Sequence, residues 1–490
     1  MIKTWADNPF LPFGAALVLV LPCQVSAQTS TLVHTFTGPG GLYPYAGLIL
    51  SGNTLYGTTY GDCSYNCGTV FKVNTDGTGF TNLHVFTADS NPYATNSDGA
   101  NPQAGLILSG NALYGTAAGG GSFGSGTVFK VNTDGTGFTN LHNFTRPDGN
   151  TLTNNDGANP YAGLIFSGNT LYGAASGGGS SANGTVFAVN IDGTGFATLH
   201  SFTAFPLYPA TPINSDGANP QAGLVLSGNT LYGAARGGGS SGNGTVFAVN
   251  TDGTGFTNLH NFTKLANTGN NSDGANPQAG LILSGNALYG TAASGGGFGN
   301  GTVFAVNTDG SGFVNLHNFT KLANTGNNSD GANPYAGLIL SGNTLFGTAR
   351  AGGSFGGGIG TVFAVNTDGT GFTNLHNFIS YPSDGANPLA GLVLSGNTLY
   401  GTTSAGGALG IGAVFSLSLS PSPSLTITHA GPNVILSWQT NFTGFTLQST
   451  TNLGSSATWT TNLLAPLVIN GQYTVSNPIS GAQQFYRLSQ

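Results

Sequence analysis

The chain has 490 residues, of which 82 are Gly and only 5% are charged; its formal net charge is −7, and it contains no Glu. Aromatic residues make up 10%, and with so little charge this excludes a disordered chain. Nine Lys and Arg residues without a basic cluster exclude a nucleic-acid-binding surface. Abundant Gly, Asn, Thr, Val and Phe favour short strands joined by tight turns, so we expect an all-β fold.

The first 27 residues have the pattern of an export signal. Lys3 provides a positive start, residues 10–23 are an apolar run, and Val25-Ser26-Ala27 offers a small-residue cleavage site. The run is short for a membrane span, although a retained anchor is the alternative. Residues 1–27 are therefore predicted to be a signal peptide. The mature protein is expected to be secreted or at the cell surface, with no membrane span after cleavage.

Two cysteines remain after the predicted signal, Cys63 and Cys67, and both lie in one Gly-flanked loop. In an oxidising compartment this spacing favours a disulfide between them. The alternative is a metal site, but two thiols without a nearby His supply only half of a zinc shell.

A repeat of 52 to 60 residues extends over residues 30–419. The tetrapeptide Gly-Thr-Val-Phe, once Gly-Ala-Val-Phe, occurs seven times, and so does Ala-Gly-Leu followed by Ser-Gly-Asn. A third marker, His-x-Phe, also occurs seven times, beginning at His34, His84, His142, His200, His260, His317 and His376.

One repeat unit divides into four predicted strands. They cover residues 104–108, 112–117, 127–132 and 138–144, and the turns between them contain Gly, Asn and Asp. Because the strands lack a clean apolar and polar alternation, we expect both faces of each sheet to be covered. Four antiparallel strands per unit are typical of one propeller blade.

The two ends of the repeat region complement each other. Residues 31–37 read as a fourth strand without the first three, and residues 413–419 read as a third strand without a fourth. Pairing these two segments would complete a seventh blade and remove exposed sheet edges. We therefore predict a seven-bladed β-propeller at residues 30–419, closed by the N-terminal strand. An open β-solenoid is the alternative.

The composition changes after the repeats. Residues 420–424 contain Pro421 and Pro423 and are predicted to be a short linker. Residues 425–490 contain Trp438, Trp459 and several short strand-like runs, which suits a small fibronectin-like β-sandwich.

The repeat units, with sequences such as AGLILSGNTLYGTAAGGG followed by GTVFAVNTDGTGFTNLHNFT, resemble the GloVer tandem-repeat family of secreted bacterial proteins. The segment ending in Phe-Tyr-Arg-Leu at residues 485–488 resembles the sandwich module that follows such arrays. The resemblance implies an exported, surface-associated protein, and it implies no activity.

No catalytic, cofactor or metal site is predicted. The seven His share one position in the repeat, and we expect the ring to hold these positions apart, each bonding a turn of its own blade. Most Asp lie in Asp-Gly turns, where a carboxylate accepts backbone N–H bonds. Only Asp62, Asp89 and Asp148 fall outside this pattern, and no pair suited to glycoside hydrolysis stands out. A calcium-binding loop is not predicted either, because the Asn-x-Asp-Gly stretch lacks the further oxygen donors that such a loop supplies.

The constant turns are expected on one face of the propeller and the variable loops on the other. Variation on one face is typical of a binding surface, and neutral drift in unimportant loops is the alternative explanation of the same variation. The candidate ligand-binding residues on the variable face are Tyr60, Phe123, Arg236, Phe298, Arg350 and Phe355.

These observations predict a monomeric, non-catalytic extracellular scaffold or binding module whose partner is a polysaccharide or a cell-surface component. The alternatives are a secreted carbohydrate-active enzyme, acting through Asp62, Asp89 or Asp148, and a structural surface or matrix component.

Overall fold

The computed structural model describes residues 2–6, 18–19, 27–61, 67–88, 94–205, 213–354, 357–379, 383–419, 425–440, 445–451, 458–461, 464–478 and 483–489. The chain forms two compact units, Ala27–Leu419 on the one hand and Met1–Ser26 with Ser420–Gln490 on the other. No helix in the described ranges is long and apolar enough to cross a membrane.

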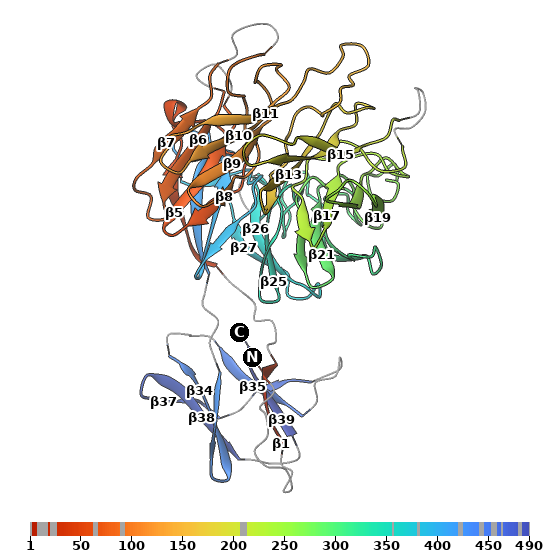
Figure 1. Cartoon of the computed structure of the whole chain (residues 1–490). Coiled ribbons are helices and arrows are strands. Elements are labelled where there is room, and N and C mark those ends of the chain that lie inside the picture. Colours follow the sequence, from red (N-terminus) through yellow and green to blue (C-terminus); the bar gives the residue numbers. More distant parts are fainter. Residues whose placement is uncertain are drawn as a thin grey trace. The chain divides into compact units, whose positions relative to one another are not determined.

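The larger unit consists of four-stranded antiparallel sheets in a propeller-like arrangement (Figure 1). Six of them take their strands consecutively from the chain. The first three are β4 (Ile49–Ser51), β5 (Thr54–Thr59), β6 (Thr69–Asn74) and β7 (Thr81–Val85); β8 (Ile107–Ser109), β9 (Ala112–Ala117), β10 (Thr127–Asn132) and β11 (Thr139–Asn143); and β12 (Ile165–Ser167), β13 (Thr170–Ala175), β14 (Thr185–Asn190) and β15 (Ala197–Ser201). The next three are β16 (Val225–Ser227), β17 (Thr230–Ala235), β18 (Thr245–Asn250) and β19 (Thr257–Asn261); β20 (Ile282–Ser284), β21 (Ala287–Ala292), β22 (Thr302–Asn307) and β23 (Val314–Asn318); and β24 (Ile339–Ser341), β25 (Thr344–Ala349), β26 (Thr361–Asn366) and β27 (Thr373–Asn377).

The last sheet joins the two ends of the repeat region. Its strand order is β29 (Val393–Ser395), β30 (Thr398–Thr403), β32 (Ala413–Leu419) and β3 (Ala27–Thr35). Ala27 lies opposite Leu419, and Thr35 lies opposite Ala413. The N-terminal strand therefore completes the sheet that the C-terminal end of the repeats leaves short of one strand. A two-stranded sheet of β28 (Gly385–Ala386) and β31 (Ala405–Gly406) and a short 3-10 helix, η1 (Gly38–Gly40), lie outside these sheets.

The predicted strands of the repeat unit are close to those observed. The second and third strands, residues 112–117 and 127–132, are β9 and β10 without change, and the fourth is shorter at both ends. The first strand differs most, because it begins at Ile107 and residues 104–106 precede it. These three residues are instead part of a segment that lies against the neighbouring sheets.

That segment is the Ala-Gly-Leu marker, and its glycines lie next to one another from each sheet to the following one. A Cβ atom built on Gly47 would lie 3.3 Å from the carbonyl oxygen of Gly391, which precedes the last sheet. The same relation links each glycine to the one in the preceding sheet: Gly105 to Gly47 at 3.3 Å, Gly163 to Gly105 at 3.6 Å, Gly223 to Gly163 at 3.7 Å, Gly280 to Gly223 at 3.3 Å, Gly337 to Gly280 at 3.1 Å and Gly391 to Gly337 at 3.4 Å. We call these seven residues the glycine ring, since the contacts return to the first sheet.

Hydrogen bonds follow the same path. Thr58 Oγ1 in the first sheet donates to the carbonyl oxygen of Ala104 before the second, at 3.2 Å, and Thr402 Oγ1 in the last sheet donates to Ala46 before the first, at 2.9 Å. The core lies between successive sheets, where Phe side chains of adjacent sheets pack edge to face, such as Phe144 and Phe187 at 5.3 Å.

The smaller unit contains two antiparallel sheets. One has the order β33 (Thr426–Ala430), β34 (Asn433–Gln439), β38 (Gln472–Pro478) and β37 (Leu467–Ile469). The other has the order β2 (Val18–Leu19), β1 (Ile2–Ala6), β39 (Gln483–Ser489), β35 (Thr446–Thr450) and β36 (Thr460–Thr461). Leu436 and Trp438 from the first sheet and Leu447 and Tyr486 from the second share one buried apolar cluster.

Strand β1 belongs to the segment predicted to be a signal peptide. It pairs with β39, with Lys3 opposite Tyr486. Cleavage after residue 27 would remove this strand from the mature protein, so the signal peptide and the export that it implies stay predictions. The same holds for the disulfide, because Cys67 is fully buried but Cys63 lies outside the described residues.

Candidate functional site

Six of the seven repeat histidines contact a buried carboxylate. Each His lies on the fourth strand of a sheet, and its Nε2 atom lies 2.8 to 3.0 Å from an Asp Oδ2 atom. The pairs are His84–Asp98, His142–Asp156, His200–Asp216, His260–Asp273, His317–Asp330 and His376–Asp384. In each pair the Asp is the first residue of an Asp-Gly-Ala-Asn-Pro motif, which lies in the connection to the next sheet.

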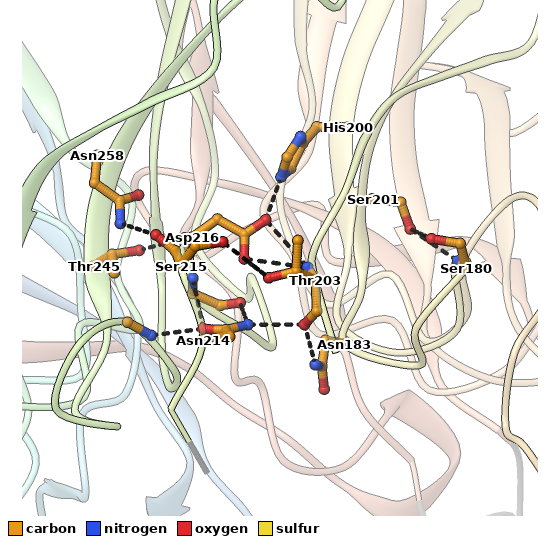
Figure 2. Close-up of polar contacts among 12 residues, drawn as sticks. Ser180, Asn183, His200, Ser201, Thr203, Asn214, Ser215, Asp216, Thr245 and Asn258 are labelled. Carbon is orange, nitrogen blue, oxygen red and sulfur yellow. Dashed lines mark hydrogen bonds and ion pairs between the residues drawn. The ribbon is translucent and has the colours of Figure 1, made fainter. Parts of the chain in front are cut away.

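Figure 2 shows one of these pairs with its surroundings. Asp216 accepts hydrogen bonds from the backbone N–H of Thr203 at 3.1 Å and from the Thr203 hydroxyl, in addition to its contact with His200. Asn214 Nδ2 donates to the carbonyl oxygens of Thr203 and Gly217 at 2.8 and 2.6 Å. The carboxylate and the amide together fix the connection that leads from one sheet to the next.

Burial by itself raises the pKa of Asp216, but the hydrogen bonds from His200 and Thr203 outweigh it and hold the pKa of the carboxyl below its usual value. The same balance, with burial as the largest opposing cause, lowers the pKa of Asp98, Asp156 and Asp273. These carboxylates are therefore ionised near neutral pH. Their stabilisation should be complete above about pH 4 and should be lost as the pH falls through their lowered pKa.

Five of these six histidine rings, all except His376, also stack on a Phe ring of the following sheet. His200 stacks on Phe256 with ring centroids 3.8 Å apart and planes 9° apart, and Phe256 precedes the fourth strand of the next sheet. The expectation that each His bonds a turn of its own sheet is therefore wrong in its detail. Each paired His contacts the connection to the next sheet, since the fourth strand lies beside that connection.

His34 differs from the other six. Gly40 occupies the position of the carboxylate, as the spacing to Pro44 and Ala46 indicates, and the described residues place no carboxylate against the ring. His34 still stacks on Phe80, at 3.8 Å. Burial lowers the pKa of this imidazole.

Beside the glycine ring lies a second set of repeat positions. The residue between Pro and Ala in each Pro-x-Ala-Gly segment is partly exposed in all seven sheets and varies in type. These residues are Tyr45, Gln103, Tyr161, Gln221, Gln278, Tyr335 and Leu389. The segments that carry these positions lie next to one another along the glycine ring.

Aromatic side chains gather among these positions. Tyr45 lies 6.4 Å from Tyr43 and 5.2 Å from Tyr60, measured between ring centroids. Tyr161, which precedes the third sheet, is near enough to Tyr60 for the Tyr60 charge to raise its pKa further, after burial.

A guanidinium group joins the same set. Arg350 Cζ lies 5.6 Å from the centroid of the Tyr335 ring, a cation–π distance. Burial, then Tyr60 and Tyr43, raise the pKa of Tyr45, whereas the positive charge of Arg350 opposes that rise. We call Tyr43, Tyr45, Tyr60, Tyr161, Tyr335 and Arg350 the inner aromatic cluster. Its side chains come from three sheets, and together they present ring faces and one cation.

The sequence matches the Gloeobacter/Verrucomicrobia repeat over residues 19–210, 151–270, 206–328 and 320–434. These matches follow one another along the chain and cover far more than half of it. The chain belongs to this repeat family. The resemblance of the repeat units to the GloVer family is thereby confirmed.

No curated protein matches the sequence of this repeat-family chain. Among solved structures, it is similar to oligogalacturonate lyase in complex with manganese, with 10% identity, 82% of this chain and 97% of that chain covered, and a TM-score of 0.45. It is also similar to a 6-phosphogluconolactonase-like protein of Bacteroides fragilis, with 17% identity, 70% and 85% coverage and a TM-score of 0.39. TolB from Acinetobacter baumannii has 11% identity and a TM-score of 0.35, and the match covers 62% of this chain. The repeat-family chain spans only 58% of the length of TolB. Likenesses at this level carry no information about what the chain does.

The candidate residues predicted from the variable loops fall into two groups. Tyr60 and Arg350 belong to the inner aromatic cluster. Arg236 is exposed at the position equivalent to Arg350, after the second strand of its sheet. Phe123 and Phe298 are exposed on Gly-rich loops and have no described contact with the cluster, and Phe355 lies outside the described residues.

Sequence reasoning missed Tyr45, Tyr161 and Tyr335. Their signal was present, because the residue after Pro is the variable position within an otherwise constant stretch of the repeat. The sequence does not show that the variable positions lie near one another, which follows only from the neighbouring segments of the glycine ring.

The remaining carboxylates offer no acid–base pair in the described parts of the chain. Asp62 and Asp89 lie outside the described residues. Asp148 accepts backbone N–H bonds from Asn150 and Thr151 at 3.0 and 2.9 Å, which lowers its pKa and makes it a turn residue. The described residues contain no group of three or more His, Cys, Asp or Glu that could hold a metal ion.

Proposed function

We propose that the chain is a non-catalytic extracellular binding module that holds a glycan at the inner aromatic cluster. The repeat region would be a closed seven-bladed β-propeller, and residues 425–490 would form a fibronectin-like sandwich. The observation that carries the proposal is the packing of Tyr45 with Tyr43 and Tyr60 in the first repeat, with Tyr161 of the third repeat near Tyr60.

Ring closure is supported by contacts between the last and the first sheet. Strand β3 supplies the fourth strand of the last sheet, and Thr402 donates to Ala46, as Thr58 does to Ala104. A closed ring leaves no sheet face uncovered at either end of the repeat region. The pairing of β3 with β32 also covers a strand edge that would otherwise invite aggregation.

A sugar ligand is supported by the kinds of side chains present. Tyr rings offer flat apolar faces for the C–H face of a sugar ring, and their hydroxyls offer polar contacts at low entropic cost. Gln103, Gln221 and Gln278, at the equivalent positions of other sheets, add amides that both donate and accept hydrogen bonds.

A non-catalytic role is supported by how the carboxylates are used. Asp216 and its counterparts are engaged by His and Thr, and Asp252 and its counterparts accept the N–H of a turn residue, Thr254 at 2.9 Å. Neither set leaves a carboxylate free beside the inner aromatic cluster to act on a bound sugar.

The test is binding of the mature chain, residues 28–490, to an array of bacterial and plant glycans. We expect binding that falls at least about tenfold in a Tyr45→Ala and Tyr161→Ala double variant, because both ring faces are lost. Phe123→Ala is the matched control, since it removes an exposed ring on a loop and should leave binding unchanged. Binding by neither protein, or breakdown of a bound polysaccharide, would contradict the proposal.

A further inference from the structure

Arginine stands out at the position that follows the second strand of each sheet. In four sheets this position holds a small buried residue, which is Ala118, Ser176, Ala293 or Ser404. In the first sheet it holds Tyr60, and in the fourth and sixth it holds the exposed Arg236 and Arg350. The backbone at this position faces the next connection, since Asn276 and Asn101 donate to the carbonyl oxygens of Arg236 and Tyr60 at 3.2 and 3.1 Å.

These two guanidinium groups have no counter-charge in the described structure. Neither Arg236 nor Arg350 takes part in an ion pair with another described residue. Arg350 instead lies against the face of the Tyr335 ring. This arrangement leaves the N–H groups at the edge of the planar guanidinium available to a ligand.

The exposed turn carboxylates lie at the other end of the sheets. Asp76 follows β6 at Asn74, which pairs with Thr54 at the start of β5, whereas Tyr60 follows Thr59 at the end of β5. Repeat symmetry places Asp134, Asp192, Asp252, Asp309 and Asp368 in the same turn. At the end that carries the inner aromatic cluster, the exposed charged side chains that the structure describes are Arg146, Arg236, Lys264, Lys321, Arg350 and Asp148.

In a chain with a net charge of −7, five of nine cations therefore lie at one end of the sheets. The six carboxylates paired with His at this end are buried and already accept several hydrogen bonds, so they do not face a ligand. Arg350, an exposed cation against the ring of Tyr335, is suited to a sugar that carries an acid group, because a guanidinium binds a carboxylate through two parallel hydrogen bonds.

We infer that the ligand of the inner aromatic cluster is an acidic glycan, whose uronate carboxylate is bound by Arg350 while Tyr45 and Tyr335 contact the sugar faces. Arg236 would contact a further acidic sugar of the same chain. The inference rests on the proposed function, and it adds the chemical class of the ligand.

The probes are hexasaccharides of glucuronate and of mannuronate, each beside a carboxyl-reduced counterpart in which every acid is an alcohol. Dissociation constants are measured for the mature chain and for Arg350→Gln, Tyr45→Ala and the control Arg146→Gln, which removes an exposed cation at the same end. Circular dichroism and the thermal midpoint verify that each variant is folded.

We expect at least one acidic hexasaccharide to bind about tenfold or more tightly than its reduced form, and this preference to weaken with added salt. Arg350→Gln should remove the preference, Tyr45→Ala should weaken both forms alike, and Arg146→Gln should change neither. If reduced and acidic forms bind equally, or if Arg350→Gln leaves the preference intact, the inference is wrong and the proposed glycan-binding function stands. If neither these probes nor any neutral glycan binds to the folded wild-type chain, the proposed function is wrong and the inference is wrong with it.

Discussion

At the scale of single residues, His34 differs because its repeat naturally lacks the His–Asp contact that the other six histidines make. His34 keeps its stacking partner Phe80, and Thr37 stands three residues after it, as Thr87 does after His84. Only the carboxylate is missing, because Gly40 replaces it. A Cβ atom on Gly40 would lie 3.4 Å from Thr37 Oγ1 and 3.5 Å from the Phe80 ring, so there is room for a side chain.

Gly40→Asp should therefore restore the contact. We expect the pKa of His34, now lowered by burial, to rise, and the free energy of unfolding to increase by about 1 kcal/mol. Because the folded pKa rises, the added stability should be greatest below the unfolded pKa, about 6.5, and should be lost as the pH increases through the folded value. NMR titration of the His34 ring and urea unfolding at pH 5.5 and 8 measure both effects.

Gly38→Asp is the matched control, because it adds the same charge to the same short helix at a position with no atom within 4 Å. An equal gain in both variants would mean that the helix end, and not His34, responds to the charge.

At the scale of elements, the middle strands depend on close packing on both faces. In β13, Gly173 pairs with Phe187 of β14, and a Cβ atom there would lie 2.6 Å from the Phe187 ring and 2.8 Å from Leu164. The same arrangement recurs in other sheets, for example at Gly115 with Phe129 and Leu106. The Gly of the Leu-Tyr-Gly stretch is thus a packing requirement, and not a turn signal.

Gly173→Ala should reduce the free energy of unfolding by roughly 1–3 kcal/mol, because two buried side chains must move. Gly223→Ala is the control: its Cβ atom would meet only the backbone of Gly163, at 3.7 Å, an ordinary contact. Thermal and urea unfolding of both variants measure the difference. Equal midpoints would show that the space around Phe187 adjusts freely.

At the scale of the whole molecule, the proposed ring closure depends on strand β3. Removal of residues 1–35 would leave β32 as an exposed edge and the last sheet with three strands. We expect the thermal midpoint of the repeat region to fall by on the order of 5 °C or more, and the protein to aggregate more readily.

Removal of residues 425–490 is the matched control, since that unit shares no sheet with the repeats. The two truncations are compared by calorimetry and light scattering. If they have the same effect on the repeat region, closure by β3 contributes nothing to its stability.

Much of this protein was determined by the sequence alone. Turn chemistry and strand patterns are local properties, so they predicted the four strands per unit and the boundaries of strands such as β9 and β10. The incomplete units at the two ends of the repeat predicted the pairing of residues 31–37 with residues 413–419, and the sequences of the repeat units carried the resemblance to the family. The same local reasoning recognised the Asp-Gly turns, in which Asp252 accepts the N–H of Thr254.

The tertiary structure alone decided which repeat positions meet. It placed Asp216 against His200, 16 residues earlier and in the preceding sheet, and it brought Tyr45, Tyr161 and Arg350 together from parts of the chain more than 100 residues apart. A repeating pattern states that positions are equivalent, but not how far each lies from the centre of the arrangement. Outer positions separate and inner positions converge, and that distance is fixed only when the sheets pack around the glycine ring.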